Sequence, residues 1–177
     1  MNDINASRLE YRSLSHSDWP FFLALNADRR VMSFISDPLD EETIRRDYFE
    51  PRLQAWEKGS EHWLCLVISE KDTGKPIGVT GFIERNEGIA EVGFILKPEY
   101  QRKGYGSESL TEMIKLAFTH YNYHKVIATV TAGNEASRKT LIKCGFQQEG
   151  SLRKSYYLNG RWQDDWLFGL LKEETHY

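Results

Sequence analysis

The sequence predicts a mixed α/β fold in which one central, mostly antiparallel sheet of about seven strands is flanked by about four helices. Three observations predict it. Strand-like runs joined by short turns follow one another between residues 62 and 97, an amphipathic helical pattern begins near residue 104, and Asn159-Gly160 marks a hairpin near the carboxyl end. No linker or repeat divides the chain, so we expect one domain over residues 1–177.

The amino-terminal third combines one strand with helical segments. Residues 8–14, RLEYRSL, alternate in polarity as a strand does. Ser15 or Ser17 then offers a helix cap, and Pro20 falls in the first turn of the following helical pattern. The polar stretch 40–59 also has a helical pattern, with a break expected near Pro51.

The middle of the chain predicts a meander and a long helix. Strands are expected at 62–70, 76–84 and 89–97, because short turns rich in Gly, Asn and Asp separate these apolar runs. A helix is expected from about 104 to 120, where the apolar positions recur on one helical face. Those positions are Leu110, Met113, Ile114, Ala117 and Phe118.

The last third predicts a strand, a helix and a hairpin. Residues 125–130, KVIATV, are rich in β-branched residues and are expected to form a short strand buried on both faces. Residues 134–146 predict a short helix that Gly145 ends at its C-terminal cap. Two strands are then expected around Asn159-Gly160.

Composition restricts the possible functions. A net charge of -3 provides no overall basic field, so direct binding of nucleic acid is not expected. The apolar runs are too short to cross a bilayer, and the first residues lack the apolar segment of a secretory signal. Cys65 and Cys144 lie in apolar segments, which favours thiols in a reduced cytoplasm over the one disulfide they could form. We therefore expect a cytoplasmic protein without membrane contact.

The stretch QRKGYGS at 101–107 stands where a strand passes into a helix. Glycines at such a junction let backbone N–H groups surround an anion, and Arg102 and Lys103 add positive charge. Taken alone, the glycines favour an exposed turn over a phosphate site. The nucleotide P-loop is excluded because no Gly-Lys-Ser/Thr follows, and the dinucleotide fingerprint is excluded because Ser109 occupies the third glycine position.

The wider context resembles a known family. Q-x-x-G-x-G at 101–106, after a strand that ends in Pro98, is similar to the acetyl-coenzyme A signature of the GNAT N-acetyltransferases. A second match follows, with N-x-x-S at 134–137 and KCGF at 143–146. The two ends of the chain resemble the RimJ/RimL branch, the ribosomal-protein alanine acetyltransferases. The resemblance covers nearly the whole chain.

The resemblance implies the GNAT fold, with the strands at 89–97 and 125–130 splayed apart, and acetyl-CoA as cosubstrate without a metal. It implies that loop amides hold the pyrophosphate and that pantetheine runs beside the strand 89–97. The N–H of Leu96 would then polarise the thioester carbonyl. The implied cofactor-binding residues are Phe94, Ile95, Leu96, Gln101, Arg102, Lys103, Gly104, Tyr105, Gly106, Ser107, Asn134 and Ser137.

The implied reaction is direct attack of a primary amine on the acetyl carbonyl. Glu91 matches an acidic strand position of the branch and is expected to act as base or to organise water, with an exposed strand-end carboxylate as the open alternative. Many GNAT enzymes protonate the thiolate with a tyrosine, but Leu141 occupies that position here. The branch places a serine where Ser137 stands, so Ser137 is expected to donate to the sulfur, unless it is only a surface hydroxyl.

The acceptor is the least defined part of the prediction. The RimJ/RimL resemblance implies a protein N-terminal α-amine, such as that of a ribosomal protein, while polyamines, aminoglycosides and amino-acid-like toxins stay open. Leu141 keeps a non-catalytic acyl-CoA sensor as a further alternative. The chain is expected to be a monomer or a homodimer. His120 and His124 have a metal-ligand spacing but are expected to be surface residues.

Overall fold

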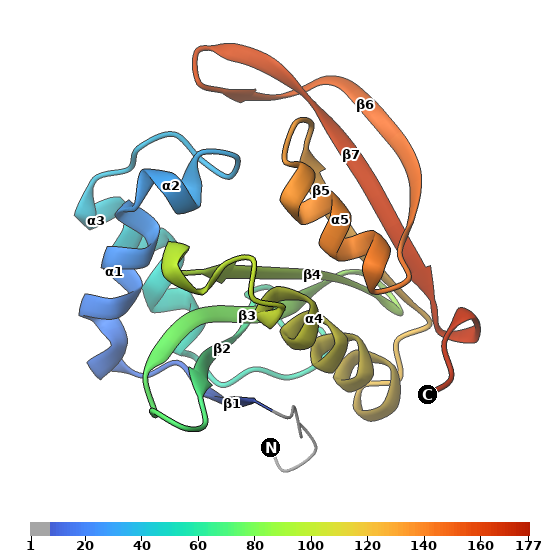
Figure 1. The fold of residues 1–177 in the computed structure, drawn as a ribbon, viewed down its shortest axis with the longest axis horizontal. Helices are drawn as coiled ribbons and strands as arrows, with labels where there is room; N and C mark the ends of the chain where they lie inside the picture. The colour runs from blue at the N-terminus through green and yellow to red at the C-terminus, as the bar shows by residue number, and fades with distance from the viewer. Residues whose placement is uncertain (1–7) are drawn as a thin grey trace.

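The structure is a computed structural model that describes residues 8–177 (Figure 1); residues 1–7 of the expected domain lie outside the described part. Its seven strands form one sheet in the order β1-β2-β3-β4-β5-β7-β6. All neighbouring strands are antiparallel except β4 and β5, which are parallel. The strands are β1 (Leu9–Ser13), β2 (Leu64–Glu70), β3 (Pro76–Asn86), β4 (Ile89–Leu96), β5 (Lys125–Thr131), β6 (Gln147–Leu158) and β7 (Arg161–Leu171). The predicted mixed α/β fold is confirmed.

The helices of the described chain lie on both faces of the sheet (Figure 1). They are α1 (Trp19–Ala27), α2 (Arg29–Met32), α3 (Glu41–Thr43), α4 (Tyr105–Lys115) and α5 (Glu135–Lys143). A π-helical turn (Leu116–His120) extends α4 to the predicted end. A π-helical turn (Ile44–Phe49) and a 3-10 turn (Glu50–Leu53) continue α3, so the helical stretch expected to reach residue 59 ends at Leu53.

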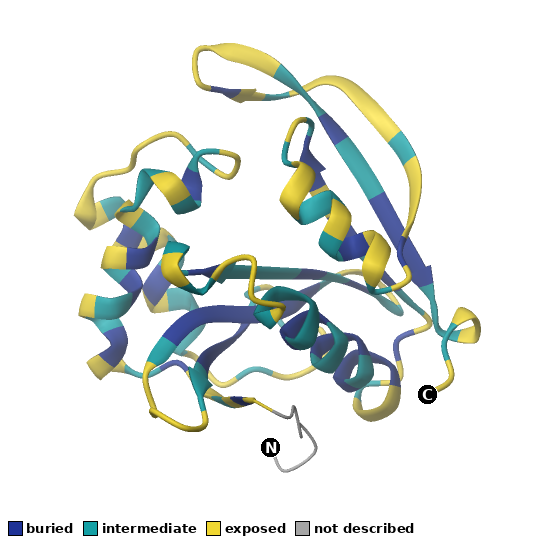
Figure 2. Ribbon diagram, viewed as in Figure 1, coloured by how far each residue is buried: buried dark blue, intermediate teal, exposed yellow. Residues whose placement is uncertain are grey.

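Side-chain alternation along β2 builds a core on each face of the sheet. Leu64 and Leu66 pack in a cluster with the apolar face of α4, as the helical pattern predicted. Cys65 and Val67 pack on the opposite face in a cluster with Phe22 of α1. We call these the α4 face and the α1 face. Both are covered, which is why β2 is buried along most of its length (Figure 2).

The parallel pair β4/β5 separates after a short contact. The two strands pair only at three positions, the last of which is Glu91 with Ile127. Beyond Glu91, β4 keeps its β3 partner but leaves its other edge unpaired, and this unpaired edge opens the splay that the family resemblance implied. The splay also corrects one expectation. The strand at 125–130 is not buried on both faces, because Thr129 is exposed and lines a cavity at the splay.

The carboxyl-terminal hairpin turns at Asn159 and Gly160, as predicted. Both residues have positive φ, 54° and 75°, as a type I′ turn requires. The β6–β7 hairpin reaches past the rest of the sheet, and much of its far end is exposed (Figures 1 and 2). Its tip contacts the loop after α2: the Tyr156 hydroxyl donates to the Ile35 carbonyl at 2.6 Å, and the Asn159 side chain donates to the Ser33 carbonyl at 3.1 Å.

Candidate active site

A cavity of about 1000 Å³ lies at the splay and is lined by elements from both faces of the sheet. We call the part lined by Leu96, Gly106 and Ser137, between the end of β4 and the first turns of α4 and α5, the cofactor arm, because the family resemblance implies the cofactor there. We call the part on the α1 face, lined by residues such as Phe22, Arg30 and Tyr156, the acceptor arm. The predicted residues that line the cavity are Glu91, Phe94, Ile95, Leu96, Gln101, Arg102, Gly104, Gly106, Ser107, Asn134 and Ser137, whereas Lys103 and Tyr105 do not.

The two loop glycines satisfy different requirements. Gly104, at the N-cap of α4, has φ +85°, a left-handed conformation that favours glycine. Gly106 lies so close to β4 that a Cβ would stand 3.1 Å from the Phe94 ring. The backbone N–H groups of Tyr105, Gly106 and Ser107 have no acceptor within the described chain, and the first intrahelical bond runs from Glu108 to Gly104. The turn therefore presents free donors at a helix N-terminus.

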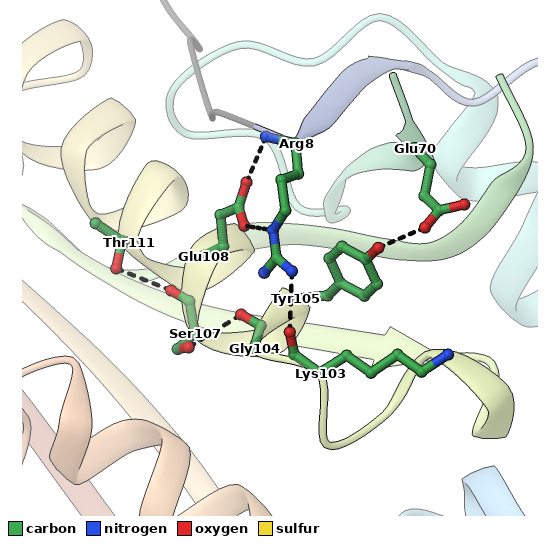
Figure 3. Close-up of polar contacts among 8 residues, drawn as sticks. All are labelled: Arg8, Glu70, Lys103, Gly104, Tyr105, Ser107, Glu108 and Thr111. Carbon is green, nitrogen blue, oxygen red and sulfur yellow. Dashed lines mark hydrogen bonds and ion pairs between the residues drawn. The ribbon is translucent and has the colours of Figure 1, made fainter. Parts of the chain in front are cut away.

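Side chains behind the loop hold this turn in place (Figure 3). Arg8 donates to the Lys103 carbonyl at 3.1 Å and to the Glu108 carboxylate at 2.7 Å. Its guanidinium also lies 4.3 Å from the centre of the Tyr105 ring, while the Tyr105 hydroxyl donates to Glu70. The Tyr105 side chain is thus an anchor on the outer side of the loop rather than part of the cavity wall.

Gln101 is a second anchor. Its side-chain amide donates to the Leu96 carbonyl at 3.1 Å and ties the loop to the end of β4. Lys103 turns toward Tyr100, with its ammonium 5.6 Å from the ring centre. Of the two basic loop side chains, only Arg102 lines the cavity, so the loop contributes mainly backbone donors.

The open edge of β4 offers further donors. The Lys97 N–H donates to the Ile77 carbonyl at 2.8 Å, which makes this pair a hydrogen-bonded one of the β3–β4 ladder. In an antiparallel ladder such pairs alternate with pairs whose backbone groups point outward. The N–H groups of Phe94 and Leu96 consequently face the splay. An extended, amide-containing ligand can pair with this edge as an added strand.

The α5 end of the cavity contains the second predicted motif. The Asn134 side chain caps α5 by accepting from the Ser137 N–H at 3.3 Å. Ser137 lines the cavity one turn into the helix. Leu141 is 2% exposed and packs in the core on the α4 face, so the common tyrosine position holds a buried apolar side chain here.

Glu91 is the last paired residue of β4 before the splay. Its neighbours Ala90 and Val92 pack toward α4, so the Glu91 side chain points to the α1 face. The Arg85 guanidinium pairs with one carboxylate oxygen, Oε2. The side chain is 16% exposed and lines the cavity.

Charged residues of the acceptor arm were missed from the sequence, among them Asp165 and Arg52. Asp165 on β7 is 9% exposed and lines the cavity, whereas its neighbour Asp164 accepts from the Lys154 N–H at 2.8 Å. Arg52, in the 3-10 turn, also lines the cavity. No sequence signal marks either residue, because the backbone path alone decides which charges turn inward.

Only one hairpin aromatic reaches the site. Tyr156 lines the cavity, and burial raises the pKa of its hydroxyl. Tyr157 and Trp162 are 53% and 59% exposed and pack against each other. Trp166 packs at the margin of the core on the α4 face.

Residues 8–177 contain no group of three or more His, Cys, Asp or Glu side chains placed to hold a metal ion. No helix within that range is long and apolar enough to span a membrane. Cys65 and Cys144 are free thiols, the first buried and the second half-buried.

An open strand edge beside a cradle of free N–H groups is the site that a CoA thioester requires. The fold and this site define an acyl-CoA-dependent transferase. The chain belongs to the GNAT acetyltransferase family: the model of the Acetyltransferase (GNAT) domain matches residues 8–147. It is accordingly an N-acetyltransferase.

The chain is similar to family members over nearly its whole length. The N-acetyltransferase YnaD of Bacillus subtilis is 28% identical over 172 residues, which are 97% of this chain and 98% of YnaD. The spermidine N(1)-acetyltransferase of Vibrio cholerae is 28% identical over 161 residues, 89% of this chain and 90% of that protein. A crystal structure of the Vibrio cholerae spermidine N-acetyltransferase with CoA and spermine has a TM-score of 0.79 at 27% identity, covering 95% of this chain and 98% of that one.

Proposed function

We propose that this protein transfers the acetyl group of acetyl-CoA directly to an α-amine. The neutral amine nitrogen attacks the acetyl carbonyl carbon, and the new C–N bond gives a tetrahedral oxyanion. The C–S bond breaks as the carbonyl re-forms, the nitrogen gives up one proton, and the departing thiolate takes one up. The observation that carries the proposal is the open β4 edge beside the free N–H groups of Tyr105, Gly106 and Ser107.

The cofactor arm suits acetyl-CoA. The N-terminal turn of α4 would bind the pyrophosphate through its free donors and the positive end of the helix dipole. The outward N–H groups of Phe94 and Leu96 would pair with the pantetheine arm, and the Leu96 N–H would stabilise the oxyanion. Asn134 would contact the cofactor from the opposite wall. Ser137 would donate to the sulfur and position it, because an unactivated hydroxyl is a weak acid.

Glu91 is the proposed base or water organiser. Its Oε2 is held by Arg85, which leaves Oε1 to accept a proton, directly or through water. An α-amine has a pKa near ~7.8 and a lysine-like amine one near ~10.4, so an α-amine loses its proton far more readily at neutral pH. An α-amine acceptor therefore needs less help from a base at Glu91 than a lysine-like amine does.

The charges of the acceptor arm also favour an α-amine over a polyamine. Arg30, Arg52 and Arg85 line this part of the cavity against the two carboxylates of Glu91 and Asp165. Because Arg30 pairs with Asp28 and Arg85 with Glu91, a polycation would meet the unpaired guanidinium of Arg52 and could offer it no anionic group. The RimJ/RimL resemblance favours the α-amine of a protein N-terminus, such as that of a ribosomal protein, and amino-acid-like small molecules present the same group.

A polyamine is the second candidate acceptor. The similarity to the Vibrio cholerae spermidine N(1)-acetyltransferase favours it. The two candidates predict different pH behaviour when the base is removed, because each amine deprotonates by itself near its own pKa.

The test is release of CoA thiol with acetyl-CoA and a panel of peptides, amino acids and polyamines, for the wild type, Glu91→Gln and Ser137→Ala. If the acceptor is an α-amine, we expect Glu91→Gln to lower kcat/KM by about 100-fold at pH 7. Its kcat/KM should then recover above pH ~8, where the amine is neutral without a base. With a polyamine, recovery would come only near pH ~10. Ser137→Ala is expected to lower kcat by about 10-fold.

Glu87→Gln is the matched control, because Glu87 is exposed in the β3–β4 turn and does not line the cavity. CoA binding without thiol release above background, across the whole panel, would instead support an acyl-CoA sensor. Unchanged rates in both site variants would refute the roles assigned to Glu91 and Ser137.

A further inference from the structure

Arg52 is a cavity-lining cation without a counter-charge. Its Nη1 donates to the Tyr48 carbonyl at 2.5 Å, and its guanidinium lies 5.7 Å from the centre of the Tyr48 ring. Within residues 8–177 no carboxylate pairs with it. Burial lowers the pKa of its guanidinium. One bonded N–H leaves most of the five guanidinium donors available to the cavity.

Its surroundings make this unpaired charge unusual. Tyr48 and Leu53, on either side of Arg52 along the chain, pack in the apolar cluster on the α1 face. That cluster includes Phe22 and Cys65, which line the same arm of the cavity. A cation that lies against an apolar surface loses hydration, and binding of an anion compensates for this loss.

Other cations of the acceptor arm are already paired. Arg30 donates to both carboxylate oxygens of Asp28, at 3.0 and 2.6 Å, and Arg85 pairs with Glu91. Conversely, Asp165 lines the cavity without a hydrogen-bond or ion-pair partner for its carboxylate in the described chain. The arm therefore exposes one free cation and one free carboxylate.

We infer that the acceptor carries a carboxylate that Arg52 binds, so the substrate class is an amino acid or amino-acid-like small molecule. This inference rests on the proposed transfer to an α-amine. Such a zwitterion matches both free charges, its carboxylate at Arg52 and its ammonium attracted by Asp165 before deprotonation. The apolar floor formed by Phe22, Cys65 and Tyr48 receives its side chain.

A single guanidinium fits a carboxylate better than the alternatives. One guanidinium neutralises only half the charge of a phosphate dianion, whereas it neutralises a carboxylate fully and binds it through a bidentate pair. A polyamine has no group for Arg52 to bind. An ordinary peptide N-terminus replaces the α-carboxylate with a neutral amide and leaves the guanidinium unpaired.

The experiment compares the standard amino acids with their carboxamides and with short N-terminal peptides, each supplied with acetyl-CoA. We expect the preferred acids to exceed their amides in kcat/KM by about 10- to 100-fold. Arg52→Gln should abolish this preference by slowing the acids and sparing the amides. Arg52→Lys should keep part of it, because the charge remains while the fork geometry is lost.

Arg46→Gln is the matched control: Arg46 lies on the preceding π-helical turn, pairs with Asp47, is largely exposed and does not line the cavity. It should behave as wild type. Calorimetric titration with CoA verifies that Arg52→Gln is folded, and titration of each protein–CoA complex with the same acids and amides measures the preference without turnover.

The outcomes separate the two hypotheses. Failure of every amine to release thiol overturns the proposed transfer, and the titrations then decide the role of Arg52 independently. If amides or peptides react as well as the acids do, or better, the carboxylate inference is overturned. The proposed transfer to an α-amine then still stands. An acid preference that survives Arg52→Gln also overturns the carboxylate inference.

Discussion

The left-handed conformation of Gly104 makes Gly104→Ala a direct test of the cradle. Gly104 has φ +85°, and an L-residue in this region costs about 1–2 kcal/mol. The added Cβ would meet Arg8 Nη2 at 3.1 Å, but that atom ends a flexible side chain and can move. We therefore expect the free energy of unfolding to fall by about 1–2 kcal/mol, which lowers Tm by roughly 2–8 °C for a chain of this size.

The same strain should weaken CoA binding. The alanine variant lowers its backbone strain by moving φ of residue 104 toward negative values, which rotates the N–H groups of Tyr105, Gly106 and Ser107 away from a common centre. Restoring the cradle around a pyrophosphate then requires the strain energy again. A cost of about 1–2 kcal/mol corresponds to an increase of about 5- to 30-fold in the Kd of CoA.

The assay combines thermal unfolding with calorimetric titration of CoA. Gly59→Ala is the matched control, since Gly59 has φ +92°, no atom within 4 Å of an added Cβ, and a place outside the cavity. Its Tm should fall by a similar amount, and it should bind CoA as the wild type does. A Gly104→Ala variant with a lowered Tm but an unchanged Kd for CoA would refute the proposed cradle. So would a Gly59→Ala variant whose CoA binding is weakened to the same extent.

Two further predictions concern titratable groups away from the cradle. Arg12 donates to both oxygens of Asp18 at 2.7 Å and lowers its pKa, so the stabilisation is present above the ordinary pKa of 3.8 and is lost as pH falls through the lower folded value. Urea unfolding should show Asp18→Asn less stable than the wild type above about pH 5 and a shrinking difference below about pH 4; a constant difference contradicts this. Burial raises the pKa of Cys65 to about 11, so iodoacetamide at pH 8 should label Cys144 faster than Cys65, and equal rates would be the contrary result.

Local sequence signals were sufficient where short-range chemistry determines the structure. Asn159 and Gly160 both adopt the positive φ that their turn requires, and the register of the β6–β7 hairpin follows from that turn. The α4 pattern predicted a buried face because its apolar period matches a helix. The helical stretch at 40–59 was too long in the prediction, since its polar residues do not mark an end. The structure ends it at Leu53, a residue that packs against the α1-face cluster.

The two arms of the cavity also differed in how far the sequence could predict their residues. The loop 101–107 and the end of β4 are neighbours in the sequence, so the motif at 101–106 predicted that they lie together, and both line the cavity. The acceptor arm is lined by Arg52 and Asp165, which come from segments more than a hundred residues apart. Asp164 and Asp165 are chemically identical in the sequence, and only the pairing of β7 with β5 decides which one faces the cavity.

The pairing of charges, rather than the fold, is what separates the possible acceptors. This chain shares its fold with a spermidine N-acetyltransferase, and a shared fold places the acceptor without choosing it. Here Asp28 neutralises Arg30, and Glu91 neutralises Arg85, so these pairs add little net field to the acceptor arm. The charges that remain, on Arg52 and Asp165, have opposite sign, and a ligand that satisfies both must itself be a zwitterion. An acceptor with only positive charges would satisfy Asp165 but leave the half-buried guanidinium of Arg52 unpaired, at the cost that burial of a lone charge imposes.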